Sequence, residues 1–289
     1  MQKLLPTHLL KVVVRVLRGT ALTLSRLSRT LNTVSLLTSS EKKIIRRNRQ
    51  FRNKHKGQRA FVIVNGPSLK EQDITMLGSE ITFVVSGFFR HEAMKKWQPS
   101  YYCIIDKNFF NGSEASRNFF VQLKEVIKTS TFFLPLYRGY KTNEEQNLLD
   151  KDKTYYVATS GLPSDNIEMD TVVQAFAGVS AFALAQAIYM GCSPIYLLGF
   201  DHDYLVNRGI DRHFYQGGTV KGDAANTRTL AERIPYDDEM AANFKLWKNY
   251  RSLHRIARKK GIEIYNATRG GYLDVFERRN YEDIDLRSR

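Results

Sequence analysis

Three ionisable side chains stand together in the second half of the chain. Asp201, His202 and Asp203 come at the end of the apolar segment 194–201 (PIYLLGFD), and Tyr204 follows them. Such groups can act as acid or base, bind a metal or contact a sugar. Neighbours in an extended chain point to opposite sides, so these three alone make a poor metal site. A solvated loop without chemistry is the alternative.

A second group combines aromatic side chains with glycines. His213, Phe214 and Tyr215 precede a Gly-Gly pair inside the polar stretch 207–228. Aromatic residues beside flexible backbone are typical of a lid that closes over a ligand. The alternative is a plain flexible insertion.

A turn sequence, Asn65-Gly66-Pro67-Ser68, follows the apolar run 60–64. Gly66 lets the backbone approach a ligand, Pro67 fixes the turn, and Ser68 can cap a following helix whose amides favour a phosphate. The spacing is neither G-x-G-x-x-G nor a Walker P-loop, which weighs against NAD and P-loop ATP chemistry. An ordinary strand–turn–helix cap explains the same residues.

The elements that position these groups follow an alternating pattern. Apolar, β-branched segments predict strands, and two amphipathic or Ala-rich stretches, 168–190 and 237–260, predict helices. The strand segments are 60–64, 81–86, 101–106, 131–135, 154–158, 194–201 and 262–267. Alternating strands and helices predict an α/β fold, a doubly wound, mostly parallel, Rossmann-like sheet in a single domain. Ligands of such sheets bind at the carboxyl ends of the strands, so the polar residues just after strands are site candidates. They are residues 65–68, 86–88, 106–108 and 201–204.

The net charge of +15 is concentrated at the N-terminus. Residues 1–60 hold fifteen Lys and Arg and one acid, which leaves 29 basic and 28 acidic residues, or +1, for the rest. This distribution weighs against a basic surface that coats duplex DNA, so no nucleic-acid partner is expected. The two cysteines, Cys103 and Cys192, exclude a disulfide scaffold and a four-cysteine zinc site.

Residues 9–34 predict a basic amphipathic helix. Its cations, Lys11, Arg15, Arg18, Arg26 and Arg29, gather on one side of the helical wheel and its Leu and Val residues on the other. Cations interrupt it too often for it to span a bilayer. We expect residues 1–57 to form an arm on an anionic membrane surface, ahead of a domain at 58–289. The protein is then cytoplasmic and peripheral on the inner face of the membrane. Packing on its own domain or on a second subunit of a homo-oligomer, a transit peptide and an RNA-binding arm are the alternatives.

The motifs together resemble those of a known family. Val64–Glu71 (VNGPSLKE), Gly178-Val179 opening an Ala-rich helix, and 191–201 (GCSPIYLLGFD) resemble bacterial sialyltransferases of the Campylobacter type. The chain, including its segment 264–276, is also similar to Rossmann-like proteins of polysaccharide gene clusters. Those proteins are related to motility accessory factors, which act as nonulosonic acid transferases. The resemblance covers about residues 60–276.

The resemblance implies a glycosyltransferase. It would move an acidic sugar of the sialic, nonulosonic or Kdo type from a CMP-activated donor to a surface-glycan or lipid-linked acceptor, without metal or other cofactor. The donor-binding residues it implies are Asn65, Gly66, Pro67, Ser68, Ser86, Gly178, Val179 and Gly199. Tyr204 and Tyr215 would hydrogen-bond the leaving phosphate, and His213 would be the general base, with His202 or Asp201 as alternatives.

The chain departs from that family at three positions. Ser86 stands where the sialyltransferases carry Asn, Ala177 stands where they carry Ser, and segment 234–238 lacks their catalytic histidine. Two other functions therefore stay open. One is diphosphate transfer of the hydroxymethylpterin type, which uses ATP and Mg²⁺ held by carboxylates. The other is a non-catalytic protein that binds a nucleotide or a glycan.

Overall fold

The computed structural model describes residues 37–160, 165–207, 213–215 and 235–286. The chain divides into two units, Met1–Lys43 and Ile44–Arg289. The predicted helix at 9–34 lies outside the described residues. The second unit includes residues 44–57, which the sequence analysis assigned to the arm by placing the boundary at 57/58.

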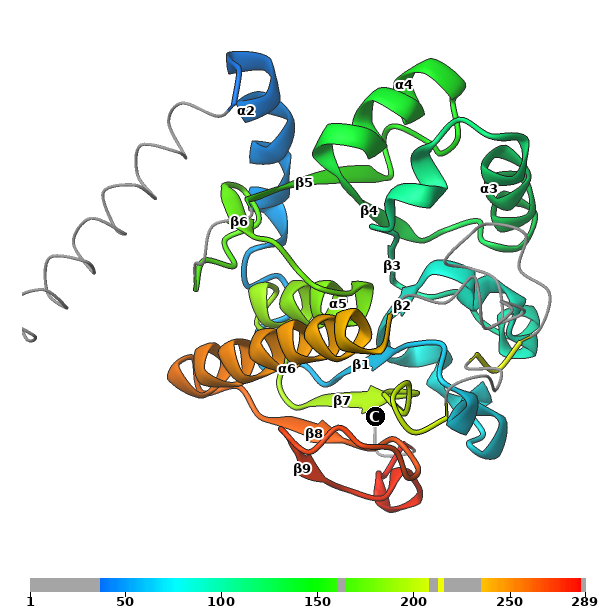
Figure 1. Cartoon of the computed structure of the whole chain (residues 1–289), viewed down its shortest axis with the longest axis vertical. Coiled ribbons are helices and arrows are strands. Elements are labelled where there is room, and N and C mark those ends of the chain that lie inside the picture. Colours follow the sequence, from blue (N-terminus) through cyan, green and yellow to red (C-terminus); the bar gives the residue numbers. More distant parts are fainter. Residues whose placement is uncertain (1–36, 161–164, 208–212, 216–234, 287–289) are drawn as a thin grey trace, which may run out of the picture. The chain divides into compact units, whose positions relative to one another are not determined.

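One parallel sheet organises the second unit (Figure 1). Among the described residues its order is β6-β5-β4-β3-β2-β1-β7-β8-β9, and every pairing is parallel. The strands are β1 (Ala60–Ile63), β2 (Ile81–Val85), β3 (Tyr101–Cys103), β4 (Thr131–Pro135), β5 (Thr154–Ser160), β6 (Val172–Gln174), β7 (Ile195–Leu198), β8 (Ile264–Asn266) and β9 (Glu277–Arg278). The chain winds outward from β1 to β6, returns to β7 beside β1, and then winds the other way. The predicted parallel, Rossmann-like α/β fold is confirmed.

Helices cover the sheet. The α-helices are α2 (Ser39–Arg46), α3 (Glu114–Val126), α4 (Lys141–Gln146), α5 (Val179–Tyr189) and α6 (Tyr236–Lys259). The short helical turns are Arg47–Phe51, Pro67–Glu71, Thr75–Ser79, Ser86–Arg90, Glu92–Lys95, Lys107–Phe110, Leu136–Tyr140 and Tyr281–Asp283. Within the described ranges, no helix combines the length and the apolar character needed to cross a bilayer.

The core lies between the sheet and two helices. α5 packs on β1, β2 and β3, and α6 packs on α5. α5 is largely apolar and is enclosed on all sides, so Ser180 to Tyr189 are all buried. Alternate strand residues such as Val62 and Phe83 face this helix layer and are fully buried. Each such side chain contributes about 1.5–3 kcal/mol to stability.

The other face of the sheet is covered by shorter elements. The Tyr102 hydroxyl in β3 donates to the Ser86 carbonyl (2.6 Å) and accepts from the Phe89 amide (2.9 Å). These bonds hold the turn Ser86–Arg90 over the face opposite α5. Phe89 in turn packs against Phe119 of α3, with ring centroids 5.4 Å apart. Both faces are therefore covered, as expected for a doubly wound sheet.

The predicted helix at 168–190 is wrong in its first part. β6 occupies Val172–Gln174, where two β-branched residues pair with Ala158 and Thr159 of β5. Gly178 is extended (φ −161°, ψ 158°), and α5 begins only after it. β9, α3 and α4 were not predicted, and the predicted helix after Ser68 is two short 3₁₀ turns.

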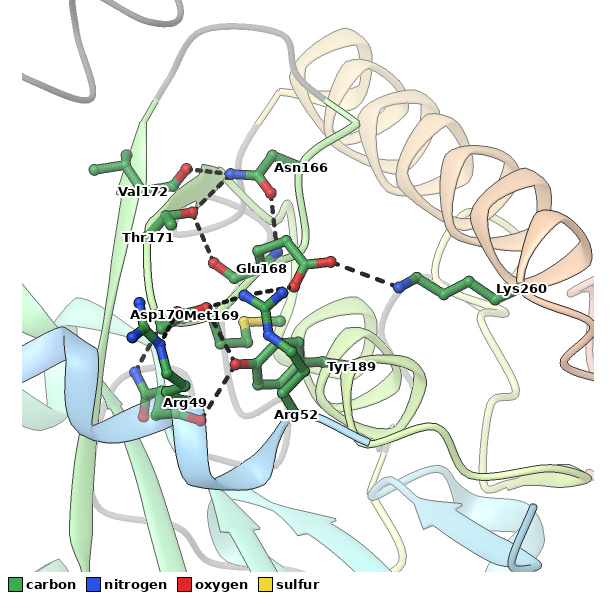
Figure 2. Close-up of polar contacts among 11 residues, drawn as sticks. Arg49, Arg52, Asn166, Glu168, Met169, Asp170, Thr171, Val172, Tyr189 and Lys260 are labelled. Atoms are coloured by element: carbon green, nitrogen blue, oxygen red, sulfur yellow. Dashed lines mark hydrogen bonds and ion pairs between the residues drawn. The ribbon is translucent and has the colours of Figure 1, made fainter. Parts of the chain in front are cut away.

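A polar network joins the segment after α2 to the β5–β6 connection (Figure 2). The buried Asn48 side chain donates to the carbonyls of Tyr156 (2.7 Å) and Met169 (2.9 Å). The Asp170 carboxylate, 2% exposed, accepts from Arg49 (3.2 Å) and Arg52 (2.7 Å). Burial alone would raise the pKa of Asp170, but the hydrogen bonds from the two arginines outweigh burial and lower it. This network anchors part of the basic N-terminal run to the body.

Candidate functional site

A cavity of about 680 Å³ lies at the carboxyl ends of the central strands. β1 and β7 are neighbours in the sheet, yet the chain leaves them in opposite directions. Such a switch point opens a crevice beyond the strand ends, where ligands of this fold class bind. The segments that line it follow β1, β2, β3 and β7, and the N-terminus of α5 and the first half of α6 complete it.

Two glycines let the ends of β1 and β7 touch. The Gly66 amide donates to the Gly199 carbonyl (3.1 Å). A Cβ atom on Gly66 would lie 1.8 Å from Oδ2 of Asp201, and one on Gly199 (φ +72°) would lie 2.3 Å from the Val64 carbonyl oxygen. Larger residues would force the two loops apart, so glycine is required at both positions.

Asp201 ties these loops together. Its Oδ1 accepts from the Ser68 amide (3.1 Å) and its Oδ2 accepts from the Ser68 hydroxyl (2.7 Å). Burial raises the pKa of Asp201 to about 6, against the opposing effect of these two hydrogen bonds. Because Ser68 engages both carboxylate oxygens, the geometry gives Asp201 a positioning role.

His202 links the β7 loop to both helices of the core. Its backbone is left-handed (φ +47°), and its Nε2 shares a hydrogen bond with the Tyr250 hydroxyl (2.8 Å). That hydroxyl lies 2.6 Å from the Ser180 hydroxyl in the first turn of α5. Burial lowers the pKa of His202 to about 4, so its ring is neutral at pH 7. Its buried Nδ1 makes no hydrogen bond with a described residue.

The segment 213–215 borders the same cavity. The Phe214 amide donates to the Asn65 carbonyl (2.9 Å), which fixes this segment beside the β1 turn. His213 lines the cavity, whereas Phe214 and Tyr215 line a second cavity of about 770 Å³. The rings of His213 and Tyr215 stack with centroids 5.1 Å apart.

One feature of the cavity favours an anionic group, and a second favours a hydrogen-bond donor. Gly178, Val179 and Ser180 place the N-terminus of α5 in its wall, and no side chain caps that helix. The amides of a first helical turn lack partners within the helix and favour negative charge. In addition, the Asn65 side chain is 7% exposed, and its Oδ1 accepts no hydrogen bond from the described residues. A ligand donor group can satisfy it.

The structure brings most of the predicted site residues together. Those that line the cavity are Asn65, Gly66, Ser86, Gly178, Val179, Gly199, Asp201, His202, Tyr204 and His213. Pro67 and Ser68 follow Gly66 in the β1 turn but do not line the cavity, and Tyr215 lines the second cavity instead. Their predicted roles as donor or phosphate contacts find no support in this geometry.

Other lining residues were given no role by the sequence analysis. Lys107 follows β3, and Glu239, Asn243 and Leu246 come from the inner side of α6. Lys107 belongs to the candidate group 106–108, which its place after a strand had marked. The α6 residues carry no local signal, because only the packing of α6 on α5 brings them to the cavity. Among the described residues, no three His, Cys, Asp or Glu gather as metal ligands.

Comparisons with known proteins give a likeness of fold. No family model matches the chain, and no curated protein matches it. Among solved structures it is similar to the Campylobacter jejuni sialyltransferase CstII with CMP-3FNeuAc, at 14% identity and a TM-score of 0.45, over 76% of this chain and 86% of that one. The same enzyme with cytidine-5'-monophosphate gives 15% and 0.44, over 77% and 84%. Its complex with a trisaccharide acceptor and CMP gives 12% and 0.43, over 76% and 85%. Identities and scores this low give no evidence on the reaction of this chain.

Proposed function

We propose that the chain is a glycosyltransferase that moves an acidic sugar from a CMP-activated donor to a surface-glycan or lipid-linked acceptor. One observation carries the proposal. The three motifs of the sequence resemblance contribute to one cavity: Asn65 and Gly66 from 64–71, Gly178-Val179, and Gly199 and Asp201 from 191–201. About 135 residues separate the first of these from the last. The cavity has the volume of a small-molecule site.

The donor would lie across the switch point. The N-terminus of α5 offers amides to the phosphate, and Gly66 leaves room for close approach of the ligand to the backbone. The Asn65 Oδ1 would accept from a hydroxyl or amino group of the nucleoside. Because Asp201, Ser68 and the paired glycines already fix these loops, binding needs little reorganisation of them.

The transfer breaks the bond between the anomeric carbon and the phosphate oxygen, and forms one from that carbon to an acceptor hydroxyl. Charge develops on the departing CMP phosphate, where the Tyr204 hydroxyl and the amides of α5 would stabilise it. His213 would take the proton of the acceptor hydroxyl. His202 would position the loop through Tyr250, since its ring is neutral and its Nε2 is engaged.

A ligand panel tests the donor class. The melting temperature would be measured with CMP, CDP, UDP, GDP and ATP, each with and without Mg²⁺. A ligand at a hundredfold above its dissociation constant adds about 2.7 kcal/mol of stability. We expect protection by CMP without Mg²⁺. Protection by ATP that requires Mg²⁺ would instead favour diphosphate transfer, and CMP binding without hydrolysis or transfer of a CMP-sugar would favour a binding protein.

The assignment of the base has a matched control. His213→Ala should abolish turnover of a CMP-activated acidic sugar while CMP protection remains. His254→Ala changes a histidine of α6 that packs on Phe276 and does not line the cavity, so turnover should persist. Equal turnover by both variants would remove His213 from the reaction.

We further propose that the N-terminal arm attaches the enzyme to the cytoplasmic face of the membrane. A lipid-linked acceptor would explain the need for attachment, because the arm concentrates the enzyme on the substrate's surface. A deletion that tests this must stop at Lys43, since the second unit begins at Ile44. The truncated protein should lose binding to vesicles that contain phosphatidylglycerol and keep its CMP affinity. Unchanged vesicle binding would refute the role of the arm.

A further inference from the structure

The carboxylates that line the site cavity would repel an anionic donor. Four carboxylates line the described part of the cavity, those of Asp106, Asp201, Asp203 and Glu239. A CMP-linked acidic sugar brings a phosphate and a carboxylate. Lys107 is the one Lys or Arg among the described lining residues.

The protein's own polar groups engage three of those carboxylates. Ser68 binds both oxygens of Asp201. The Asp203 Oδ2 accepts from the Asn207 side chain (2.7 Å), and the Asp106 Oδ1 accepts from the Asn108 amide (2.8 Å). These bonds offset part of the negative charge that a donor would meet. The Lys107 ammonium, by contrast, makes no hydrogen bond or ion pair with a described residue.

The backbone of Lys107 is well anchored. Asp106 caps the turn Lys107–Phe110, and the Phe109 amide donates to the Asp106 carbonyl (3.2 Å). Phe109 and Phe110 are buried, while the Lys107 side chain is exposed. The fold therefore fixes the point from which the ammonium extends and leaves its long side chain free to reach a ligand.

The location of Lys107 along the sheet matters for what it can contact. It follows β3, whereas the loop Asp201–Tyr204 follows β7, three positions away in the order β3-β2-β1-β7. Three strand spacings amount to about 14 Å. The N-terminus of α5, which packs over β1 to β3, also lines the cavity. A donor that extends from the β7 loop to Lys107 would place its anionic groups between the ammonium and the α5 amides.

We propose that Lys107 is the residue that selects an anionic donor, through an ion pair between its ammonium and the phosphate or the sugar carboxylate. The inference rests on the proposed function and assigns the charge selectivity of that site. The buried, unpartnered Oδ1 of Asn65 in the same wall supports a ligand there independently of charge.

Titration calorimetry with three probes tests the inference: cytidine, CMP and CMP-N-acetylneuraminate. The variant is Lys107→Gln, and the control is Lys70→Gln, a lysine of the second cavity that does not line the first. The wild-type protein should bind CMP at least tenfold more tightly than cytidine. Lys107→Gln should lower the affinity for the anionic probes about tenfold, leave cytidine unchanged, and be largely reversed in Lys107→Arg. Lys70→Gln should match the wild type.

The probes separate the two anionic groups. A loss that is already complete with CMP assigns the phosphate as the partner of Lys107, and a loss confined to the nucleotide sugar assigns the carboxylate. Undiminished affinity of Lys107→Gln for both anionic probes would overturn the inference while the proposed function stands. If the wild-type protein binds none of the three probes, the proposed function fails and the inference fails with it.

Discussion

Replacing Asp201 by Asn should change how the stability of the protein depends on pH. Burial raises the pKa of this carboxyl from its ordinary value of 3.8 to about 6. Below about pH 4 the group is protonated in both states and costs nothing. Between about pH 4 and pH 6 the unfolded chain releases the proton while the folded protein keeps it, so stability falls as the pH rises. Above pH 6 the folded protein carries the buried charge, and the loss is complete.

The size of the effect follows from the two pKa values. At 1.36 kcal/mol per pKa unit, a change from 3.8 to about 6 corresponds to about 3 kcal/mol. The amide of Asp201→Asn can keep both contacts, because its oxygen can accept from the Ser68 amide and its nitrogen can donate to the Ser68 hydroxyl. The variant should therefore gain about 3 kcal/mol on the wild type between pH 4 and pH 7.

Urea unfolding at half-unit steps from pH 4 to pH 7.5 measures this. The quantity of interest is the difference in unfolding free energy between Asp201→Asn and the wild type, because groups common to both cancel. Ser68→Ala is the informative companion. It removes a hydrogen bond that lowers the pKa of Asp201, so the loss of stability should continue to higher pH.

A difference that stays flat across this pH range would refute the reasoning. It would mean that the carboxyl is as well solvated in the folded protein as in the unfolded chain. A difference that falls with rising pH would go further. It would show that the hydrogen bonds from Ser68 stabilise the ionised form of Asp201 by more than burial destabilises it. The clamp, as we call the contact between Ser68 and Asp201, would then depend mainly on the carboxylate charge.

Three further substitutions probe the supports of the site and of the fold. Gly66→Ala would place a methyl group against Asp201, and should lower the melting temperature and abolish CMP protection. Its control is Gly261→Ala (φ +69°), which has open space around it and should lower the unfolding free energy by only about 1–2 kcal/mol in chemical denaturation. Asp170→Asn should destabilise the protein by about 1–3 kcal/mol in urea titrations, because it removes two ion pairs of a buried carboxylate. The loss is limited to this range because the arginine partners are partly exposed, and no change would mean that the ion pairs add nothing to stability. Tyr250→Phe leaves the buried His202 Nε2 and the Ser180 hydroxyl without their shared partner and should cost about 1–3 kcal/mol in the same assay; a neutral effect would show that water replaces the hydroxyl.

The sequence predicts the strands of this fold better than its helices. Runs such as 60–64 and 194–201 are short, apolar and β-branched, and their central position in the sheet makes that pattern unambiguous. β6 was missed because the helix predicted from the Ala-rich stretch, which begins at Ala175, was extended back over Val172-Val173. Those residues form a strand only because β5 is there to pair with them, which is a tertiary effect.

In the site too, local sequence patterns predict some features, whereas others depend on contacts between residues far apart in the sequence. The turn at Asn65-Gly66 and the loop after Asp201 stand at strand ends, so the fold class alone predicts that they lie close together. The clamp between Ser68 and Asp201 and the chain from His202 through Tyr250 to α5 join residues 48 to 133 positions apart. No local pattern encodes such pairs. Tyr215 is the converse case: it was predicted together with His213 from one local pattern, but His213 lines the site cavity and Tyr215 lines the second cavity.

The charge of the N-terminal region also changes meaning once the fold is known. Counting cations treats residues 1–60 as one basic arm. In the structure, Arg52 binds Asp170 and Arg59 binds Glu80, two carboxylates whose side chains are 2% exposed or less. These arginines compensate buried acids and are not free to attract lipid headgroups. A free Lys or Arg near an anionic membrane surface would contribute about 1 kcal/mol to binding. The proposed attraction to an anionic surface is therefore assigned mainly to the cations before Ile44. A membrane test that removes residues beyond Lys43 would also remove part of the body, and would measure its unfolding as well as loss of binding.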